Sequence, residues 1–432
     1  MGLPVVAILG RPNVGKSTLF NRLTRKREAI VDDNPGVTRD RNYSNVEWDG
    51  KEFILVDTGG VITDTDDQLA IDIRYQAEIA AREADLVLFI VENSINPEDR
   101  EIARNLRKQS LPIFLVVNKT DNEKLELNAM DAWNLGLGEP IPISALNGRG
   151  VGDFLDKMVE KLPEEGKGQN LEGETRIAVI GKPNVGKSSL INTLLGKNKL
   201  LVSEIPGTTR DSIDTEIEYK DHKWLLTDTA GLLRKQYGVQ YYSSLRTLSA
   251  IKRSDIVLLM ADAVGGFSHQ DKRIAAMAVD FYKGLVIAFN KWDLKERGPG
   301  VVEDFMKLFK VNNRFLDFVP IYRMSVLDNK GIERVLDGIE KVIEERKKRI
   351  STSELNSFIG SIIQKRPPSY QAGKRPNIMY VTQTQGDPPI FHFFCRGSKY
   401  IQDNYKKYLY NAIRAEYGFN GVSIKMVFRE RR

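Results

Sequence analysis

The chain has 432 residues, of which 41% are hydrophobic and 28% charged, a composition typical of a globular protein, and this length predicts two to four domains of about 100–200 residues. Its single cysteine, Cys395, excludes a disulfide framework, and its three histidines argue against a zinc site. The net charge is +6, no apolar run approaches the roughly 18 residues of a membrane helix, and no signal peptide precedes the first strand, so we expect a cytoplasmic protein without a membrane partner.

Short apolar runs alternate with amphipathic segments through most of the chain. Such runs predict the buried strands of mostly parallel sheets with helices on both faces, an α/β fold that binds ligands at the carboxyl ends of its strands. We predict strands at residues 5–9, 53–56, 86–91 and 113–117, and again at 177–180, 224–226, 256–260 and 285–289.

The second set of strands repeats the first. Lys16 and Lys187 are 171 positions apart, and Asp57 and Asp228 have the same separation. A fixed separation between motifs indicates a duplicated domain. The sequence therefore predicts two homologous domains, 1–162 and 175–350, joined by a polar, glycine-bearing linker at 163–174.

The last part of the chain differs in pattern and in charge. A long charged helix is predicted at 332–349, and Ser351-Thr-Ser-Glu354 resembles a capping box that starts another. Strands at 377–383 and 390–395, a helix at 399–417 and a strand at 422–428 complete a small α+β domain, 351–432. This domain has 13 Lys+Arg against 5 Asp+Glu. That excess favours a polyanionic partner such as nucleic acid over the alternative of a solubilising tail.

A phosphate-binding sequence, G-x-x-x-x-G-K-S, follows the first strand of each large domain, at 10–17 and 181–188. The glycines turn backbone N–H groups toward a phosphate, the helix start adds its dipole, the lysine reaches the outer phosphates and the serine ligates Mg²⁺. The predicted contacts are Gly10, Asn13, Val14, Gly15, Lys16, Ser17 and Thr18 in the first copy, and Gly181, Asn184, Val185, Gly186, Lys187, Ser188 and Ser189 in the second.

An Asp-x-x-Gly motif follows a later strand in each domain, at 57–60 and 228–231. Alone, this motif most simply indicates a turn. Behind a phosphate loop, Asp57 and Asp228 can hold Mg²⁺ through water, and Gly60 and Gly231 let a γ-phosphate approach the backbone.

An Asn-Lys-x-Asp motif predicts which base is bound. The carboxylate accepts hydrogen bonds from N1–H and the 2-amino group of guanine, whereas adenine lacks that donor pair and would leave a buried acceptor unpaired. The lysine stem can lie over the base, and a backbone N–H of a following Ser-x-Leu loop could meet the guanine oxygen. The predicted contacts are Asn118, Lys119, Asp121, Ser144 and Ala145, and Asn290, Lys291, Asp293, Ser325 and Val326.

These elements, in this order and twice over, resemble the bacterial ribosome-assembly GTPases called EngA or Der across essentially the whole chain. Residues 35–40 and 206–211 match that family's first switch, Asn290-Lys-Trp-Asp293 matches its second guanine motif, and a basic KH-like domain closes its members. The resemblance implies that Thr38 and Thr209 ligate Mg²⁺ when GTP is bound. Val326 replaces the usual alanine, which a contact through the backbone N–H should tolerate.

Ras-like GTPases orient the attacking water with a glutamine just after Asp-x-x-Gly, but this chain has Val61 and Leu232 there. Asn13 and Asn184 resemble the asparagine that helps related GTPases hold K⁺ against the phosphates, where a cation neutralises developing charge. One alternative is that both asparagines only stabilise their loops. Another is an arginine finger from within the chain, for which the nearest residues are Arg39 and Arg210.

The basic domain suggests contacts with RNA. Its basic loops at 365–368 and 374–376, interleaved with Tyr370 and Tyr380, could meet phosphates while the rings stack on bases. Its only Gly-x-x-Gly sequence, 418–421, falls between the last helix and the last strand, so we interpret it as a helix cap and turn and not as a KH clamp. Residues 234–242 are expected to form a switch.

The sequence thus predicts an enzyme with two Mg²⁺-dependent GTPase domains and a KH-like domain. It is expected to be a monomer that binds GTP, GDP and K⁺, converts GTP and water to GDP and phosphate, and, from the resemblance, acts with the large ribosomal subunit and its rRNA and not with DNA. The rival is a GTP-sensing RNA-binding scaffold in which one domain hardly hydrolyses GTP; a tRNA-modification GTPase is disfavoured by the lone cysteine and the tandem layout. The predicted catalytic residues are Asn13, Lys16, Thr38, Gly60, Asn184, Lys187, Thr209 and Gly231, and the Mg²⁺ ligands are Ser17, Thr38, Asp57, Ser188, Thr209 and Asp228.

Overall fold

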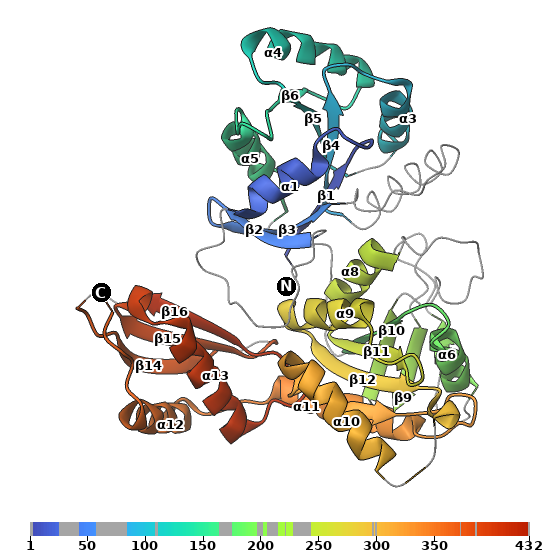
Figure 1. Ribbon diagram of the computed structural model, residues 1–432, viewed down its shortest axis with the longest axis vertical. Helices are drawn as coiled ribbons and strands as arrows, with labels where there is room; N and C mark the ends of the chain where they lie inside the picture. Colours follow the sequence, from blue (N-terminus) through green and yellow to red (C-terminus); the bar gives the residue numbers. More distant parts are fainter. Residues whose placement is uncertain are drawn as a thin grey trace. The chain divides into compact units, whose positions relative to one another are not determined.

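A computed structural model describes residues 3–25, 43–57, 84–108, 111–163, 175–196, 202–204, 215–220, 222–227, 243–295, 298, 300–371, 373–384 and 387–430. The chain forms two compact units, one from most of residues 1–170 and the other from most of residues 171–432 (Figure 1). Among the described residues, no helix is long and apolar enough to cross a membrane.

The first unit is built on a six-stranded sheet of order β2-β3-β1-β4-β5-β6. Neighbouring strands are parallel except for β2 and β3. The strands are β1 (Val5–Leu9), β2 (Tyr43–Trp48), β3 (Lys51–Asp57), β4 (Leu86–Glu92), β5 (Ile113–Asn118) and β6 (Ile141–Pro142). The described helices are α1 (Lys16–Arg25), α3 (Pro97–Leu106), α4 (Glu123–Ala129) and α5 (Val151–Glu160).

The second unit repeats this plan in a seven-stranded sheet of order β13-β12-β11-β7-β10-β9-β8. The two pairs that β9 makes, with β8 and with β10, are antiparallel, and the other pairs are parallel. The strands are β7 (Thr175–Gly181), β8 (Val202–Glu204), β9 (Thr215–Tyr219), β10 (His222–Thr227), β11 (Ile256–Asp262), β12 (Gly284–Asn290) and β13 (Ile321–Arg323). The described helices are α6 (Lys187–Leu195), α9 (His269–Asp280), α10 (Val301–Asn312) and α11 (Ile332–Lys347), and residues 250–253 of α8 (Ser243–Arg253) also belong to this unit.

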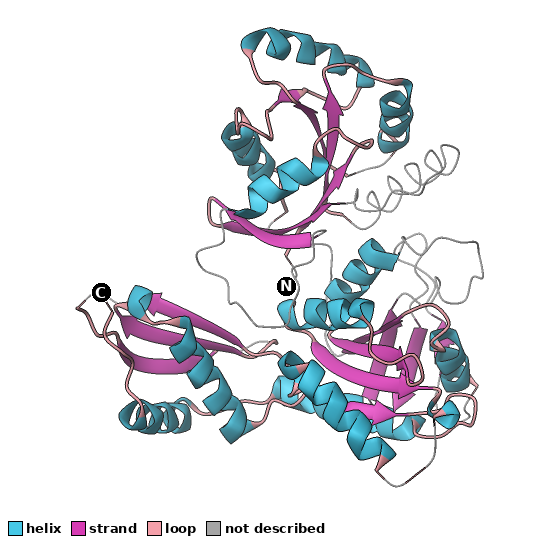
Figure 2. Cartoon of the chain, viewed as in Figure 1, coloured by secondary structure: helices cyan, strands magenta, loops and turns pink. Residues whose placement is uncertain are grey.

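The central strands of both sheets are apolar along their whole length because helices pack on either side (Figure 2). Every residue of β12 is buried, and so is every residue of β4 before Glu92. All eight predicted strands are present in these two sheets. Their registers bring the motifs to the carboxyl edge, where Asn118 lies opposite Glu92 and Asn290 lies opposite Asp262.

The C-terminal part of the second unit is a three-stranded sheet with two helices. β15 (Ile390–Arg396) is antiparallel to β14 (Asn377–Gln383) and parallel to β16 (Lys425–Glu430), and the helices are α12 (Thr352–Lys365) and α13 (Asp403–Tyr417). Ser351 Oγ accepts a hydrogen bond of 3.3 Å from the Glu354 N–H, so the predicted helix start is confirmed.

Two element boundaries in this domain differ from the prediction. The helix predicted from residue 399 begins at Asp403, because Ser398–Tyr400 form a separate 3-10 turn after Gly397. The strand predicted from residue 422 begins at Lys425, because Val422 forms an isolated antiparallel bridge with Gly284 of β12 instead. The bridge from Val422 thus joins the C-terminal domain to the GTPase sheet.

The Gly-x-x-Gly segment has a structural role. Gly418 ends α13 with φ 82°, and its N–H donates to Arg414 O at 2.9 Å, which confirms the cap interpretation. Gly421 donates to Phe318 O at 2.7 Å, and a Cβ added there would lie 2.4 Å from Val342 Cγ2. A side chain would therefore press against α11, and it would also come within 3.0 Å of Leu285 O of β12.

A buried arginine also crosses this junction. Arg346 of α11 donates from Nε to Asp387 Oδ2 at 3.0 Å and from Nη1 to Tyr282 O at 2.9 Å. The C-terminal domain is therefore held to the second GTPase domain by backbone pairing and by an ion pair.

Two candidate nucleotide-binding sites

The P-loop lysines occupy the same position in both units. Lys16 Nζ donates to Gly10 O at 2.8 Å and to Arg11 O at 2.7 Å. Lys187 Nζ donates to Gly181 O and to the carbonyl of the next residue at 2.8 and 2.6 Å. Each ammonium is thus held inside its loop, where the phosphates of a nucleotide would lie.

Two glycines of each loop are required by close contacts. Gly10 has φ 151°, and a Cβ there would lie 2.3 Å from Ile90 O. Gly15 has φ 93°, and its Cβ would lie 2.2 Å from Asn118 Nδ2. The second loop repeats both contacts at Gly181 and Gly186, with distances of 2.2 and 2.3 Å. Any side chain would therefore push each loop away from the neighbouring strand, β4 or β11, or from the asparagine of the Asn-Lys-x-Asp motif.

Burial lowers the pKa of both lysines. Desolvation is the largest cause that lowers the pKa of Lys16, to about 8, and burial lowers the pKa of Lys187 to about 8 as well. An ammonium that is poorly solvated before the ligand arrives gains most from a phosphate partner. The geometry and the pKa values together favour an anionic ligand in both loops.

The first loop also places two oxygen groups where a metal ion would need them. Ser17 Oγ donates to Asp57 Oδ2 at 2.7 Å, at the start of α1 and the end of β3. Hydroxyl and carboxylate oxygens are the ligands that Mg²⁺ prefers, so this pair fits such an ion. Ser188 begins the equivalent turn of α6.

Several predicted residues lie outside the part of the chain that the structure describes. These are Thr38, Asp228, Thr209, Gly60 and Gly231, together with Val61, Leu232, Arg39 and Arg210.

One asparagine in each site joins the phosphate loop to both base-reading loops. Asn118 donates from Nδ2 to Val14 O at 2.8 Å and accepts at Oδ1 from the Ala145 N–H at 2.8 Å. Asn290 does the same with Val185 O at 2.7 Å and the Val326 N–H at 3.0 Å. The backbone N–H groups that we assigned to the guanine oxygen thus bond to asparagine in this structure.

The carboxylates predicted to read guanine have different surroundings. Asp121 Oδ1 accepts from Ser144 Oγ at 2.6 Å and from Asn147 Nδ2 at 3.0 Å. Asp293 Oδ1 is buried and accepts no hydrogen bond from any residue that the structure describes, which is the condition of an acceptor that a base would satisfy. The residue that corresponds to Asn147 is Asp328, whose carboxylate has no proton to donate.

The lysines of the Asn-Lys-x-Asp motifs are held by acidic residues on the neighbouring strand. Lys119 has φ 64° and pairs with Glu92 at the end of β4. Lys291 has φ 61° and pairs with Asp262 of β11 at 2.8 Å. Their stems are therefore fixed at the edge of the sheet next to the base readers.

Sequence reasoning missed the acids that support these sites. Asp85 and Asp255 accept the backbone N–H groups of Val5 and Arg176 at 2.7 and 2.9 Å, where the phosphate-loop strands begin. The repeat could have revealed them, because Asp85 and Asp255 are 170 positions apart, as are Glu92 and Asp262.

Comparisons with known proteins agree with this geometry. A family model described as "50S ribosome-binding GTPase" matches residues 5–119 and 176–291. A second, described as the KH-domain-like C-terminal part of EngA bacterial GTPase enzymes, matches residues 349–429. Over 445 residues, the chain is 46% identical to GTPase Der of Thermomicrobium roseum, covering 100% of this chain and 97% of that protein. The chain belongs to the GTPase Der family.

Two further comparisons are with another GTPase Der and with a solved structure. GTPase Der of Halothermothrix orenii is 44% identical over 437 residues, with 100% of both chains covered. A crystal structure of an Era variant from Aquifex aeolicus, bound to GDP and AlF4⁻, aligns at 26% identity with a TM-score of 0.31, covering 48% of this chain and 74% of that one.

Family membership settles several expectations. The two larger sheets belong to tandem GTPase domains, and residues 349–429 match the KH-like domain of the family. The chain is a GTPase with a guanine-nucleotide site in each of the first two domains.

Proposed function

We propose that this GTPase cycles on and off the large ribosomal subunit while that subunit is assembled in the cytoplasm, as a monomer that hydrolyses GTP in both domains. The observation that carries the proposal is the repetition of one loop geometry in two sites, in a chain whose family is described as 50S ribosome-binding. The domain boundaries are proposed as 1–162, 175–350 and 351–432.

Each site would need Mg²⁺. Ser17 and Asp57 would hold the ion in the first site, Ser188 and Asp228 would hold it in the second, and Thr38 and Thr209 would complete each set when GTP is bound. The ion would supply positive charge against the β- and γ-phosphates. Lys16 and Lys187 would add a second positive charge against the phosphates.

We further propose that K⁺ assists hydrolysis. Asn13 and Asn184 are exposed and have φ 66° and 63°, and neither side chain makes a hydrogen bond to any described residue. That observation supports a ligand role over the alternative in which the amides brace their own loops. Val61 and Leu232 stand where Ras-like GTPases have a glutamine. A K⁺ ion held by Asn13 or Asn184 would instead neutralise the charge that develops on the phosphates during hydrolysis.

The test of K⁺ is GTP turnover in potassium and in sodium at equal ionic strength. Wild type should be faster in potassium, and Asn13→Ala or Asn184→Ala should remove the difference in its own site with little loss of GDP affinity. Equal wild-type rates in the two salts would favour an arginine finger instead.

The rival function is a GTP-sensing scaffold with one active domain. Single-turnover hydrolysis distinguishes the two. We expect Lys16→Ala and Lys187→Ala each to leave the other site hydrolysing GTP, whereas a scaffold would lose all turnover with one variant and none with the other.

The KH-like domain would contribute phosphate contacts. Its basic loops lie against their own aromatic rings, with Arg375 5.6 Å from the centroid of Tyr370 and Lys374 5.8 Å from that of Tyr400. Tyr380 stacks on Phe394 at 4.4 Å. These rings thus already contact basic side chains or another ring of the same domain. This favours recognition of RNA phosphates by the basic residues over stacking of the rings on bases.

Point substitutions test this contact better than removal of residues 351–432, since the domain is joined to β12. Replacing Lys374 and Arg375 with glutamine should flatten the slope of log affinity against log salt by about 1 to 2. An unchanged slope would remove these residues from the RNA contact.

A further inference from the structure

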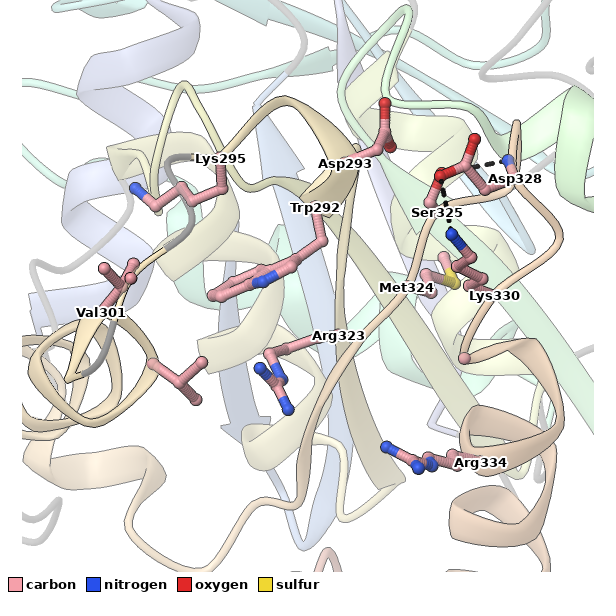
Figure 3. Close-up of a pocket in the computed structure, with 13 residues that line it drawn as sticks. Trp292, Asp293, Lys295, Val301, Arg323, Met324, Ser325, Asp328, Lys330 and Arg334 are labelled. Atoms are coloured by element: carbon pink, nitrogen blue, oxygen red, sulfur yellow. Dashed lines mark hydrogen bonds and ion pairs between the residues drawn. The ribbon is translucent and has the colours of Figure 1, made fainter.

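A pocket adjoins the second guanine site and is lined mostly by residues to which no role has been assigned above. It has a volume of about 440 Å³, which suits a mononucleotide-sized group. Its wall includes Asp293 and Ser325 of the base-reading loops, further residues of those loops, and side chains from β13, α10 and the start of α11 (Figure 3).

An arginine in this pocket is held in place by aromatic rings. The Arg323 guanidinium lies 5.3 Å from the centroid of the Trp292 ring. Trp292 meets Phe305 edge-on at 5.1 Å, and Phe305 meets the fully buried Phe289 edge-on at 4.7 Å. The exposed guanidinium is thus supported by a row of rings that reaches the core, so it is pre-organised to receive a ligand.

The pocket has an excess of positive charge. Arg323 and Arg334 form no ion pair or hydrogen bond through their side chains with any described residue, although the pocket contains two carboxylates. One of these, Asp328, is 3.6 Å from Lys330 and is therefore already partly neutralised. Figure 3 shows Arg323 between the Trp292 ring and Arg334. Both guanidinium groups line the pocket and are therefore available to an anionic ligand in it.

We propose that this pocket binds one nucleotide of a single-stranded RNA segment. A base would stack on the planar Arg323 guanidinium beside the Trp292 ring, and Arg334 would take a phosphate through two of its N–H groups. An acidic peptide would use the charges but would gain nothing from stacking on the planar guanidinium. The class of partner rests on the proposed function, since ribosomal RNA is the RNA that this GTPase would meet.

RNA bound in the pocket would affect nucleotide binding in the second site, because the two sites share loops. Trp292 precedes the base reader Asp293, and Arg323 lies two residues before Ser325. RNA that fixes Trp292 and Arg323 would also fix these base readers. RNA bound here should therefore raise the GTP affinity of the second site, and by linkage GTP should raise the RNA affinity by the same factor.

The experiment uses the full chain, a 12-nucleotide single-stranded RNA of mixed sequence and poly-glutamate as an acidic-peptide probe. The readout is the part of the tryptophan fluorescence that Trp292→Phe removes, which reports this pocket even if the KH-like domain also binds RNA. We expect RNA to quench this signal. Arg323→Ala and Arg334→Ala should each weaken the response at least tenfold, while Arg314→Ala, an exposed arginine of the same domain outside the pocket, should change it less than twofold.

Conservative substitution separates stacking from charge. Arg323→Lys keeps the charge without the planar group, so it should also weaken the RNA response several-fold. A response to poly-glutamate but not to RNA, or no response to either, would overturn the proposal. Wild-type binding to ribosomal subunits that depends on GTP would still support the proposed function in that case, so the two failures are distinguishable.

Discussion

Replacing Asn118 with alanine should damage the first guanine site while leaving the second intact. The side chain forms two buried hydrogen bonds, to Val14 O and from the Ala145 N–H, both of 2.8 Å. Removal leaves both backbone groups unpaired, at about 1–2 kcal/mol each. The two groups together cost about 2–4 kcal/mol. If this loss falls mainly on the loops that hold the nucleotide, GDP should bind about 30- to 700-fold more weakly, because 1.4 kcal/mol corresponds to roughly a tenfold change in affinity.

The assay is a titration with fluorescent GDP in a Lys187→Ala background, which leaves the first site as the main reporter. Asn290→Ala in a Lys16→Ala background is the matched variant, since Asn290 makes the equivalent bonds at 2.7 and 3.0 Å. Asn118→Asp should be intermediate, because it keeps the acceptor for Ala145 but loses the donor to Val14. GDP affinity of Asn118→Ala within twofold of wild type would refute the role of this residue as the link between the loops.

Three further predictions concern base choice, pH and domain docking. Asp121→Asn and Asp293→Asn should each switch their site from GTP toward XTP, and a variant with full GTP affinity and none for XTP would show that its carboxylate does not read the base. The pKa of Lys16 in the empty site is about 8, and bound phosphates favour its ammonium form. The GDP affinity of the first site should therefore be constant below pH 8 and should decrease above it, by up to about tenfold per pH unit. Titration with GDP across pH 7–10 measures this. Arg346→Ala should lower the free energy of unfolding by about 2–4 kcal/mol in urea denaturation, since it breaks the ion pair with Asp387, whereas Arg314→Ala should change it by less than about 0.5 kcal/mol.

The nucleotide sites could be predicted from the sequence because their geometry depends on local motifs. Gly10 and Gly15 sit at positive φ in contacts that admit no Cβ, and the apolar runs before them can only be buried strands. Long-range partners are harder to predict. The carboxylate of Asp85 caps the start of β1 from a position 80 residues away, and nothing around it in the sequence distinguishes it from a surface acid.

Edge strands and domain junctions were missed for a related reason. β2 at the edge of the first sheet, and β9 next to the edge of the second, mix polar and apolar residues because only one of their faces is turned to the core, so they have no continuous apolar run. Val422 has the composition of a strand residue, but it pairs with Gly284 outside its own sheet. A choice of pairing partner is decided by the tertiary fold and cannot be found from local propensity.

The most direct test of the central claim is sedimentation of the full-length protein with purified large and small ribosomal subunits. We predict that it pellets with the large subunit in the presence of a non-hydrolysable GTP analogue and is mostly released in GDP. Pelleting that is equal in the two nucleotides, or that favours the small subunit, would contradict the account.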